Sequence, residues 1–167
     1  MSRGFVREDD QEEVPIVPQR AYLPEGVTNF VTPNGMNRLL TEKQMLVNEK
    51  GTLDNTNENE KRIALNYINA KLQLLNSRIA EAKIINLNEQ PQNEIKFGAT
   101  ITLKTEASKD IQIFQIVGVD EADISKGKVS FKSPIARVLI NKKIGDKVIL
   151  KQANKDIVFE IINILYS

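Results

Sequence analysis

The sequence predicts an α+β protein in which an antiparallel helical hairpin precedes an antiparallel sheet that carries one short helix. Two segments between residues 32 and 87 repeat their apolar residues every three to four positions, and a polar turn separates them. After residue 94 apolar and polar residues alternate, which is the period of a strand with one buried face. The change of period indicates that the helices come first and the sheet follows.

Composition limits the chemistry that is open to the chain. Its 167 residues are 41% apolar, enough for a packed core, and they include neither Cys nor His. Disulfides, thiolate metal sites and an imidazole base are therefore excluded. The 23 basic and 22 acidic residues nearly cancel, which argues against binding duplex nucleic acid through a basic excess. Because no apolar stretch is long enough for a membrane span or signal peptide, we expect a cytoplasmic protein.

Residues 1–31 are predicted to form a mostly mobile arm. This segment is rich in acidic residues and is interrupted by Pro15, Pro18 and Pro24. Such a composition cannot bury enough apolar area to offset the entropy of ordering the chain. Docking of the arm on a neighbouring surface is the less favoured alternative.

Residues 32–87 are predicted to form the hairpin. Thr32 before Pro33 is a helix start, Gly51 is a helix end, and Asn57 with Glu60 resembles a capping box for the second helix. Because the turn between the helices is short, they are expected to run antiparallel.

Each helix carries an apolar face. The first helix is expected to pack through Met36, Leu39, Leu40, Leu46 and Val47. The second is expected to pack through a heptad seam of Leu65, Ile68, Leu72, Leu75, Ile79 and Ala82. Since the two faces satisfy each other within one chain, a monomer is expected.

A linker over residues 88–93 leads to the sheet domain at 94–167. Ser133 before Pro134 repeats the helix start signal, and a brief amphipathic helix is expected from there to Ile140. Strands are expected over residues 95–104, 111–117, 129–131, 148–150 and 157–166.

Three motifs in this domain resemble a known family. The sequence reads FGATITL over 97–103, IVGVDEAD over 116–123 and SPIARVLI over 133–140, with Gly145-Asp146 following. Their order and spacing are similar to the carboxy-terminal domain of the bacterial Gre transcript-cleavage factors. The hairpin stands where that family has its coiled coil, whereas the arm falls outside the resemblance.

The resemblance implies a fold, a partner and an activity. It implies an FK506-binding-protein-like sheet domain that docks on bacterial RNA polymerase near the secondary channel. The hairpin would enter the channel, and two acidic side chains at its tip would act beside the catalytic magnesium of the polymerase. Such a factor stimulates cleavage of backtracked transcripts without being an enzyme itself. It binds no cofactor alone, shares Mg²⁺ with the polymerase, and meets RNA and DNA only within the elongation complex.

The hairpin tip departs from the family pattern. Aligning Gly51 and Leu53 with the family's tip block puts Thr52 and Asn55 where its two acids belong. The hairpin is also shorter by roughly seven residues per helix, which shortens the rod by about 10 Å. The remaining candidate metal ligands are Asp54, Glu58 and Glu60. The alternative is that Asp54 belongs to the turn while the two glutamates favour the positive end of the second helix.

The resemblance also implies which residues contact the polymerase. They are Asp120, Glu121, Asp123, Ser133, Pro134, Ile135 and Ala136. The alternative is structural: Ser133 and Pro134 start a helix, and Ile135 and Ala136 pack beneath it. For Ser133 both roles are expected.

Three functions remain open from the sequence. The first is an elongation factor that binds the polymerase and stimulates transcript cleavage. The second is a regulator of the same shape that binds the channel without stimulating cleavage. The third, a prolyl isomerase, rests on the implied fold alone and is disfavoured, because a fold does not carry an activity and few aromatics are present to line such a pocket.

Overall fold

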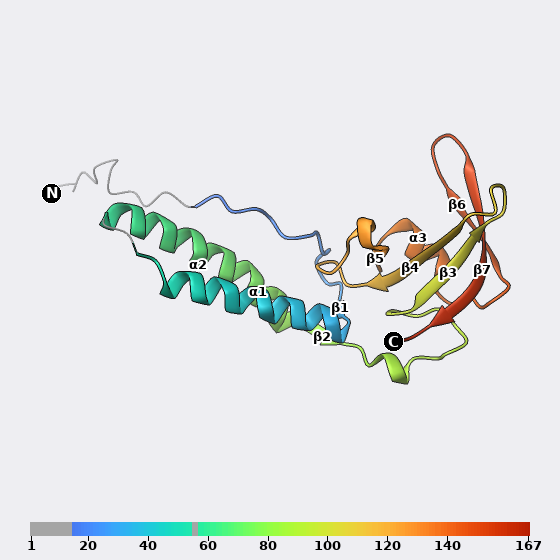
Figure 1. Ribbon diagram of the computed structural model, residues 1–167, viewed down its shortest axis with the longest axis horizontal. Coiled ribbons are helices and arrows are strands. Elements are labelled where there is room, and N and C mark those ends of the chain that lie inside the picture. Colours follow the sequence, from blue (N-terminus) through green and yellow to red (C-terminus); the bar gives the residue numbers. More distant parts are fainter. Residues whose placement is uncertain (1–14, 55–56) are drawn as a thin grey trace, which may run out of the picture.

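The computed structural model describes residues 15–54 and 57–167 of the chain. Helices α1 (Pro33–Gly51) and α2 (Glu58–Glu81) form an elongated antiparallel hairpin, and a curled sheet domain lies at one end of it (Figure 1). The predicted α+β class, with the hairpin before the sheet, is confirmed. Residues 1–14 of the predicted arm lie outside the described residues. Neither long helix in the described part is apolar enough to cross a membrane.

The helices begin where the sequence predicts. The Thr32 hydroxyl accepts a hydrogen bond from the Gly35 amide at 2.9 Å, and Pro33 occupies the first helical position. The Asn57 side chain accepts from the amides of Asn59 at 2.9 Å and Glu60 at 3.4 Å. Both helix starts are therefore fixed by residues close to them in sequence.

The two helices pack through a narrow apolar seam. Leu39 and Leu46 of α1 meet Ile68 and Leu75 of α2, and all four side chains are buried. Partly buried residues extend this core: Met36, Leu53, Leu72, Ile79 and Ala82. The expectation for Leu40 and Val47 was wrong, because these side chains are 45% and 44% exposed on the flank of α1.

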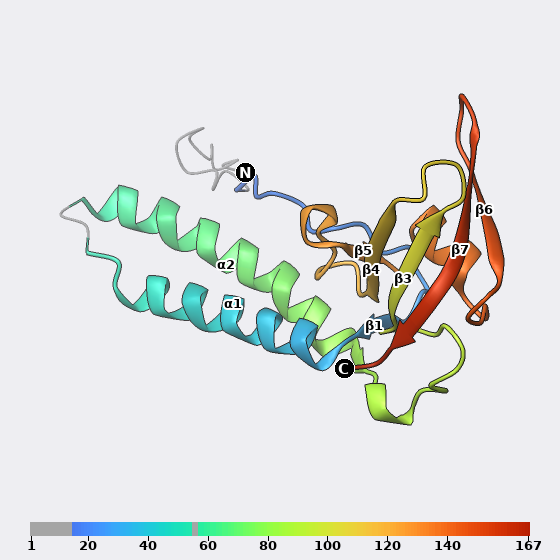
Figure 2. The ribbon, with the colours of Figure 1, turned by 45° about the vertical axis from the view of Figure 1, so that its right-hand side comes forward.

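A small parallel sheet joins the hairpin to the rest of the chain. Strand β1 (Asn29–Val31) precedes α1 and pairs with β2 (Ala82–Ile84), which follows α2 directly. The second helix therefore ends at Glu81 rather than continuing toward residue 87. This pairing links residues more than fifty positions apart, and strands of three residues carry no periodic signal. The described part of the arm, residues 15–28, runs back along the hairpin to this junction (Figures 1 and 2).

The sheet domain contains five strands in the order β5-β4-β3-β7-β6. They are β3 (Thr100–Thr105), β4 (Ile111–Val117), β5 (Lys128–Ser130), β6 (Lys147–Lys151) and β7 (Asp156–Leu165). Helix α3 (Pro134–Leu139) packs against the sheet through Ala136 and Leu139. The 3₁₀ turn η2 (Leu87–Glu89) lies between β2 and β3, and η3 (Ile124–Lys126) lies between β4 and β5. The expected sheet was antiparallel, but β4 and β5 pair in parallel because the chain crosses back through a long loop between them.

The core lies between the sheet and α3. Ile101 and Leu103 of β3, Ile161 of β7 and Leu139 of α3 are fully buried. Ile95 and Phe97 also belong to the core, but they precede β3 instead of forming its start. Gly98 interrupts the expected strand there with a φ of +89°, a conformation that favours glycine.

Candidate partner-binding surface and hairpin tip

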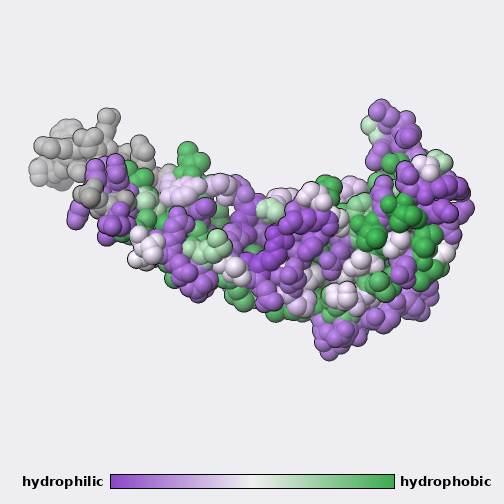
Figure 3. Space-filling view, viewed as in Figure 1, coloured by the Kyte–Doolittle hydropathy of each residue, from purple (hydrophilic) through white to green (hydrophobic). Residues whose placement is uncertain are grey.

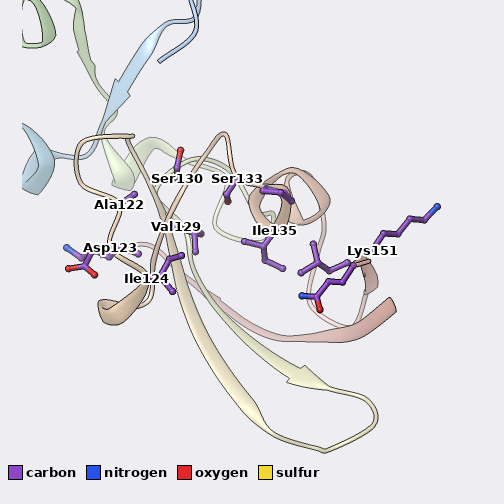
Figure 4. A pocket seen from close by; sticks show the side chains of 12 residues that line it. Ala122, Asp123, Ile124, Val129, Ser130, Ser133, Ile135 and Lys151 are labelled. Atoms are coloured by element: carbon purple, nitrogen blue, oxygen red, sulfur yellow. The ribbon is translucent and has the colours of Figure 1, made fainter. Parts of the chain in front are cut away.

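A hollow of about 540 Å³ opens beside the free edge of β5. The loop after β4, strand β5, the start of α3 and the end of β6 line it (Figure 4). Its lining residues are Ala122, Asp123, Ile124, Lys128, Val129, Ser130, Ser133, Pro134, Ile135, Leu150, Lys151 and Gln152. The structure therefore brings the predicted Asp123 and the start of the SPIARVLI motif together around one concave site.

The floor of the hollow is apolar and its ends are charged. Val129 and Ile135 face the same space, with Ile124 on the neighbouring loop, while the Asp123 and Lys151 side chains point outward at opposite ends (Figure 4). Ile124 is 83% exposed, which is unusual for a large aliphatic side chain. Over the whole face seen in Figure 3, hydrophobic residues gather mainly on the sheet domain.

Sequence reasoning missed three apolar residues of this hollow. Ile124, Val129 and Leu150 lie outside the predicted surface, yet they supply much of its aliphatic lining. Only Ile124 gave a local signal, because it is an isolated apolar residue between Asp123 and Ser125 in a polar loop. Val129 and Leu150 reach the hollow through strand pairing and chain crossing, which no local pattern reveals.

Asp123 and Ser133 have structural roles at the rim. The Asp123 carboxylate accepts hydrogen bonds from the Ser125 hydroxyl at 2.6 Å and the Ser125 amide at 3.0 Å. The hydroxyl bond is the main reason that the pKa of Asp123 lies below its ordinary value. The Ser133 hydroxyl accepts from the Ala136 amide at 3.3 Å and so caps α3. Partner contact by either residue stays a prediction.

Three of the predicted contact residues are buried in this structure, and partner contact by them stays a prediction. Ala136 is fully buried in the core of the sheet domain. The side chains of Asp120 and Glu121 are only 7% and 3% exposed. Both acids are paired with residues of the arm, the hairpin or the sheet domain.

Glu121 joins the start of α1 to the sheet domain. Its carboxylate accepts hydrogen bonds from the Thr32 hydroxyl, from the Asn34 amide group at 2.8 Å and from the Lys128 ammonium at 3.1 Å. Burial alone raises the pKa of Glu121, but these three donors together outweigh it and hold the pKa below its ordinary value. The carboxylate is therefore ionised and satisfied inside the protein.

The hairpin tip presents its acids to solvent without gathering them. Asp54, Glu58 and Glu60 are exposed, and the two glutamates lie in the first turn of α2, where the helix dipole favours negative charge. Within the described residues, no group of three acidic side chains is arranged to hold a metal ion. Asn55 lies outside the described residues.

Comparison with known proteins identifies the sheet domain. Residues 90–166 match the family described as "Transcription elongation factor, GreA/GreB, C-term". Residues 90–166 are therefore a domain of the GreA/GreB type. The resemblance seen in the three motifs is thereby confirmed, and the hairpin precedes this GreA/GreB domain in the chain.

The curated relatives agree with this assignment. The transcription elongation factor GreA of Maricaulis maris is 41% identical over 80 residues, which cover 48% of this chain and 51% of that protein. GreA of Beijerinckia indica is also 41% identical, over 93 residues that cover 56% and 59% of the two chains. The chain thus spans little more than half the length of these relatives.

Solved structures include more distant neighbours. GreA factor homolog 1 (Gfh1) of Thermus thermophilus aligns with 83% of this chain and 99% of its own, at 19% identity and a TM-score of 0.40. At this distance the Gfh1 structure assigns no function to the present chain.

Proposed function

We propose that this chain with a GreA/GreB-type domain docks on bacterial RNA polymerase through the hollow at β5 and α3, and directs its hairpin into the secondary channel. The exposed Ile124 beside an aliphatic hollow is the observation that carries the proposal. An apolar cavity with a polar rim suits a partner that inserts an apolar side chain, since buried anchors of this kind dominate interface energies. The residues that line the hollow are aliphatic, polar or charged, which gives no support to prolyl isomerisation.

The hairpin is long enough to hold its tip well away from the proposed docking surface. Its first helix has 19 residues and is therefore about 28 Å long. The sheet domain lies at the opposite end from the tip (Figure 1), so docking and tip action are separated in space. In this proposal the chain works as a monomer in the cytoplasm, where the polymerase acts.

The activity proposed for the tip is stimulation of transcript cleavage by the polymerase. Asp54, Glu58 and Glu60 are exposed carboxylates, and carboxylate oxygens are the ligands that Mg²⁺ prefers. Because the described tip does not assemble a cluster of its own, its carboxylates would complete a magnesium site provided mainly by the polymerase. The chain is then an accessory factor, not an enzyme.

The second candidate is a channel-binding regulator that does not stimulate cleavage. It is favoured by Thr52, which stands at a position where the family pattern has an acid. Both candidates share the same docking step and differ only in what the tip does.

A binding measurement tests the shared step. Ile124→Asp should weaken association with purified bacterial RNA polymerase at least tenfold, because a carboxylate would enter an apolar interface. Ile144→Asp is the matched control, since Ile144 is also exposed, at 55%, but does not line the hollow. Equal affinity of the two variants, or no association of the unmodified protein with polymerase, would overturn the proposed docking site.

A cleavage measurement separates the two candidates. Stalled, backtracked polymerase with Mg²⁺ should release shortened transcripts when the protein is added, and Asp54→Asn, Glu58→Gln or Glu60→Gln should reduce this release. Glu81→Gln, at the other end of α2, controls for loss of one negative charge. Intact transcripts despite tight binding would establish the regulator and reject the ligand role of the tip acids.

A further inference from the structure

Arg20 of the arm connects the hairpin to the sheet domain. Its guanidinium donates two parallel hydrogen bonds to the Glu42 carboxylate on α1, at 2.7 and 3.0 Å. Its Nε donates to Asp120 Oδ1 at 3.0 Å, in the loop that follows β4. One side chain from the amino-terminal arm therefore links two elements that are distant from each other in sequence. Planar bidentate pairing of this kind fixes direction as well as distance.

Arg78 of α2 reinforces the same junction. It donates to Asp120 Oδ2 at 3.2 Å and to the backbone carbonyl of Ala21. The Asp120 carboxylate is thus shared by two arginines, one from the arm and one from the hairpin. The arm backbone at Ala21 is held by the hairpin in turn. The three segments form one closed network.

A second set of contacts lies at the start of α1 and acts as a pivot. Thr32 and Asn34 bind Glu121 there, and the Phe30 ring packs on Phe97 and Phe131 at centroid distances of 5.8 and 5.7 Å. These contacts hold one end of the hairpin on the sheet domain. They lie close together, so by themselves they resist rotation of a long rod only weakly.

Glu42 lies well away from that pivot. It is ten residues beyond Thr32, which places it about 15 Å further along the helix. A contact at this distance from the pivot opposes rotation of the hairpin far more effectively than a contact at the pivot itself. The side chains of Arg20 and Asp120 are 18% and 7% exposed, so water screens their pair less than an ordinary surface ion pair.

We propose that Arg20 is a brace that sets the direction of the hairpin relative to the sheet domain. It lies outside the matched GreA/GreB region at 90–166, and it adds a contact between the hairpin and the sheet domain to those made by Arg78 and by the start of α1. Removing it frees the hairpin to turn about the Thr32–Glu121 pivot. A rotation of about 20° moves the end of a helix of about 28 Å by about 10 Å.

Arg20 would also affect where the hairpin tip lies, and this part of the inference rests on the proposed function. A metal ligand has to be placed to within about half an ångström. A hairpin tip whose position varies by several ångströms therefore rarely holds its carboxylates where a metal ion could bind them. Arg20 would then be a positioning residue that acts on the tip through the direction of the rod.

Distance measurement between spin labels tests the brace in the free protein. The chain has no native Cys, so Lys61→Cys near the tip and Gln112→Cys on β4 give a single labelled pair at exposed positions. We expect one narrow distance distribution in the parent protein and a distribution at least twice as broad after Arg20→Gln. Arg38→Gln, which removes an exposed arginine from the same helix as Glu42, should leave the distribution narrow.

Two further measurements guard against a simple folding defect. Glu42→Gln removes the hairpin side of the brace while leaving Arg20 and Asp120 in place, and it should broaden the distribution as well. Molar salt added to the parent protein should do the same, since part of the brace is open to screening. Superimposable distributions for the parent, Arg20→Gln and Glu42→Gln proteins would overturn the proposal. Because no polymerase is present, this outcome is independent of the proposed function.

Discussion

Gly35→Ala gives the most direct test of how the hairpin is seated on the sheet domain. Gly35 is the third residue of α1, and a Cβ added there would lie 2.8 Å from Glu121 Oε1 and 3.3 Å from Thr32 Oγ1. Real Cβ atoms do not approach an oxygen that closely, so the carboxylate has to move. It cannot move freely, because Thr32, Asn34 and Lys128 all donate to it.

Two opposing effects set the size of the change. Alanine favours a helix over glycine by at most about 1 kcal/mol, and less than this in a first turn. Losing one hydrogen bond to a buried carboxylate costs about 1.5–3 kcal/mol. The loss exceeds the gain, so we expect Gly35→Ala to reduce the free energy of unfolding by about 1–2 kcal/mol.

The assay is thermal and urea unfolding followed by circular dichroism, with Gly51→Ala as the matched control. Gly51 is the last residue of the same helix, and no atom lies within 4 Å of the Cβ that would be added there. Gly51→Ala should therefore be neutral or stabilising by up to about 1 kcal/mol. If Gly35→Ala is as stable as Gly51→Ala, the Glu121 carboxylate is not held against the start of α1 as described.

Other substitutions probe the core, the pH response and a buried hydroxyl. Leu75→Ala in the hairpin seam, at 0% exposure, should lower the free energy of unfolding by about 2–5 kcal/mol in urea titrations. Because the pKa of Glu121 is lowered on folding from an ordinary value of 4.5, its contribution is complete above that value and is lost as the pH falls through the folded pKa. Melting temperatures recorded on acidification should therefore decline, and less steeply for Glu121→Gln. Tyr166→Phe removes a hydroxyl that donates to Glu94 O at 2.6 Å and accepts from the Lys96 amide at 2.7 Å, which should cost about 1–2 kcal/mol by the same titration.

The elements set by local chemistry were predictable from the sequence. Thr32, Asn57 and Ser133 cap the helices that they precede, because a cap and its target amide lie within three residues of each other. The change from helical to alternating period also located the sheet domain. The pairing of β1 with β2 was missed because its partners are far apart in the chain and each strand has only three residues.

The sequence did not reveal that Asp120 and Glu121 bind other segments of the same chain. Asp120 and Glu121 look like surface acids in a loop, and their donors come from residues 20, 32, 34, 78 and 128. Nothing in the local sequence distinguishes a solvated carboxylate from one whose partners arrive from other segments. The described part of the arm was predicted to be mobile for the same reason. Its contact with the rest of the protein depends on ion pairs from Arg20 to Glu42 and Asp120, which lie in distant segments of the chain.

The loop after β4 has two faces within five consecutive residues. Asp120 and Glu121 point toward the hairpin, whereas Ala122, Asp123 and Ile124 border the hollow. The residues that border the hollow are therefore joined by one peptide bond, between Glu121 and Ala122, to the residues that hold the start of the hairpin. A partner bound in the hollow would therefore lie next to the two carboxylates that bind the arm and the hairpin.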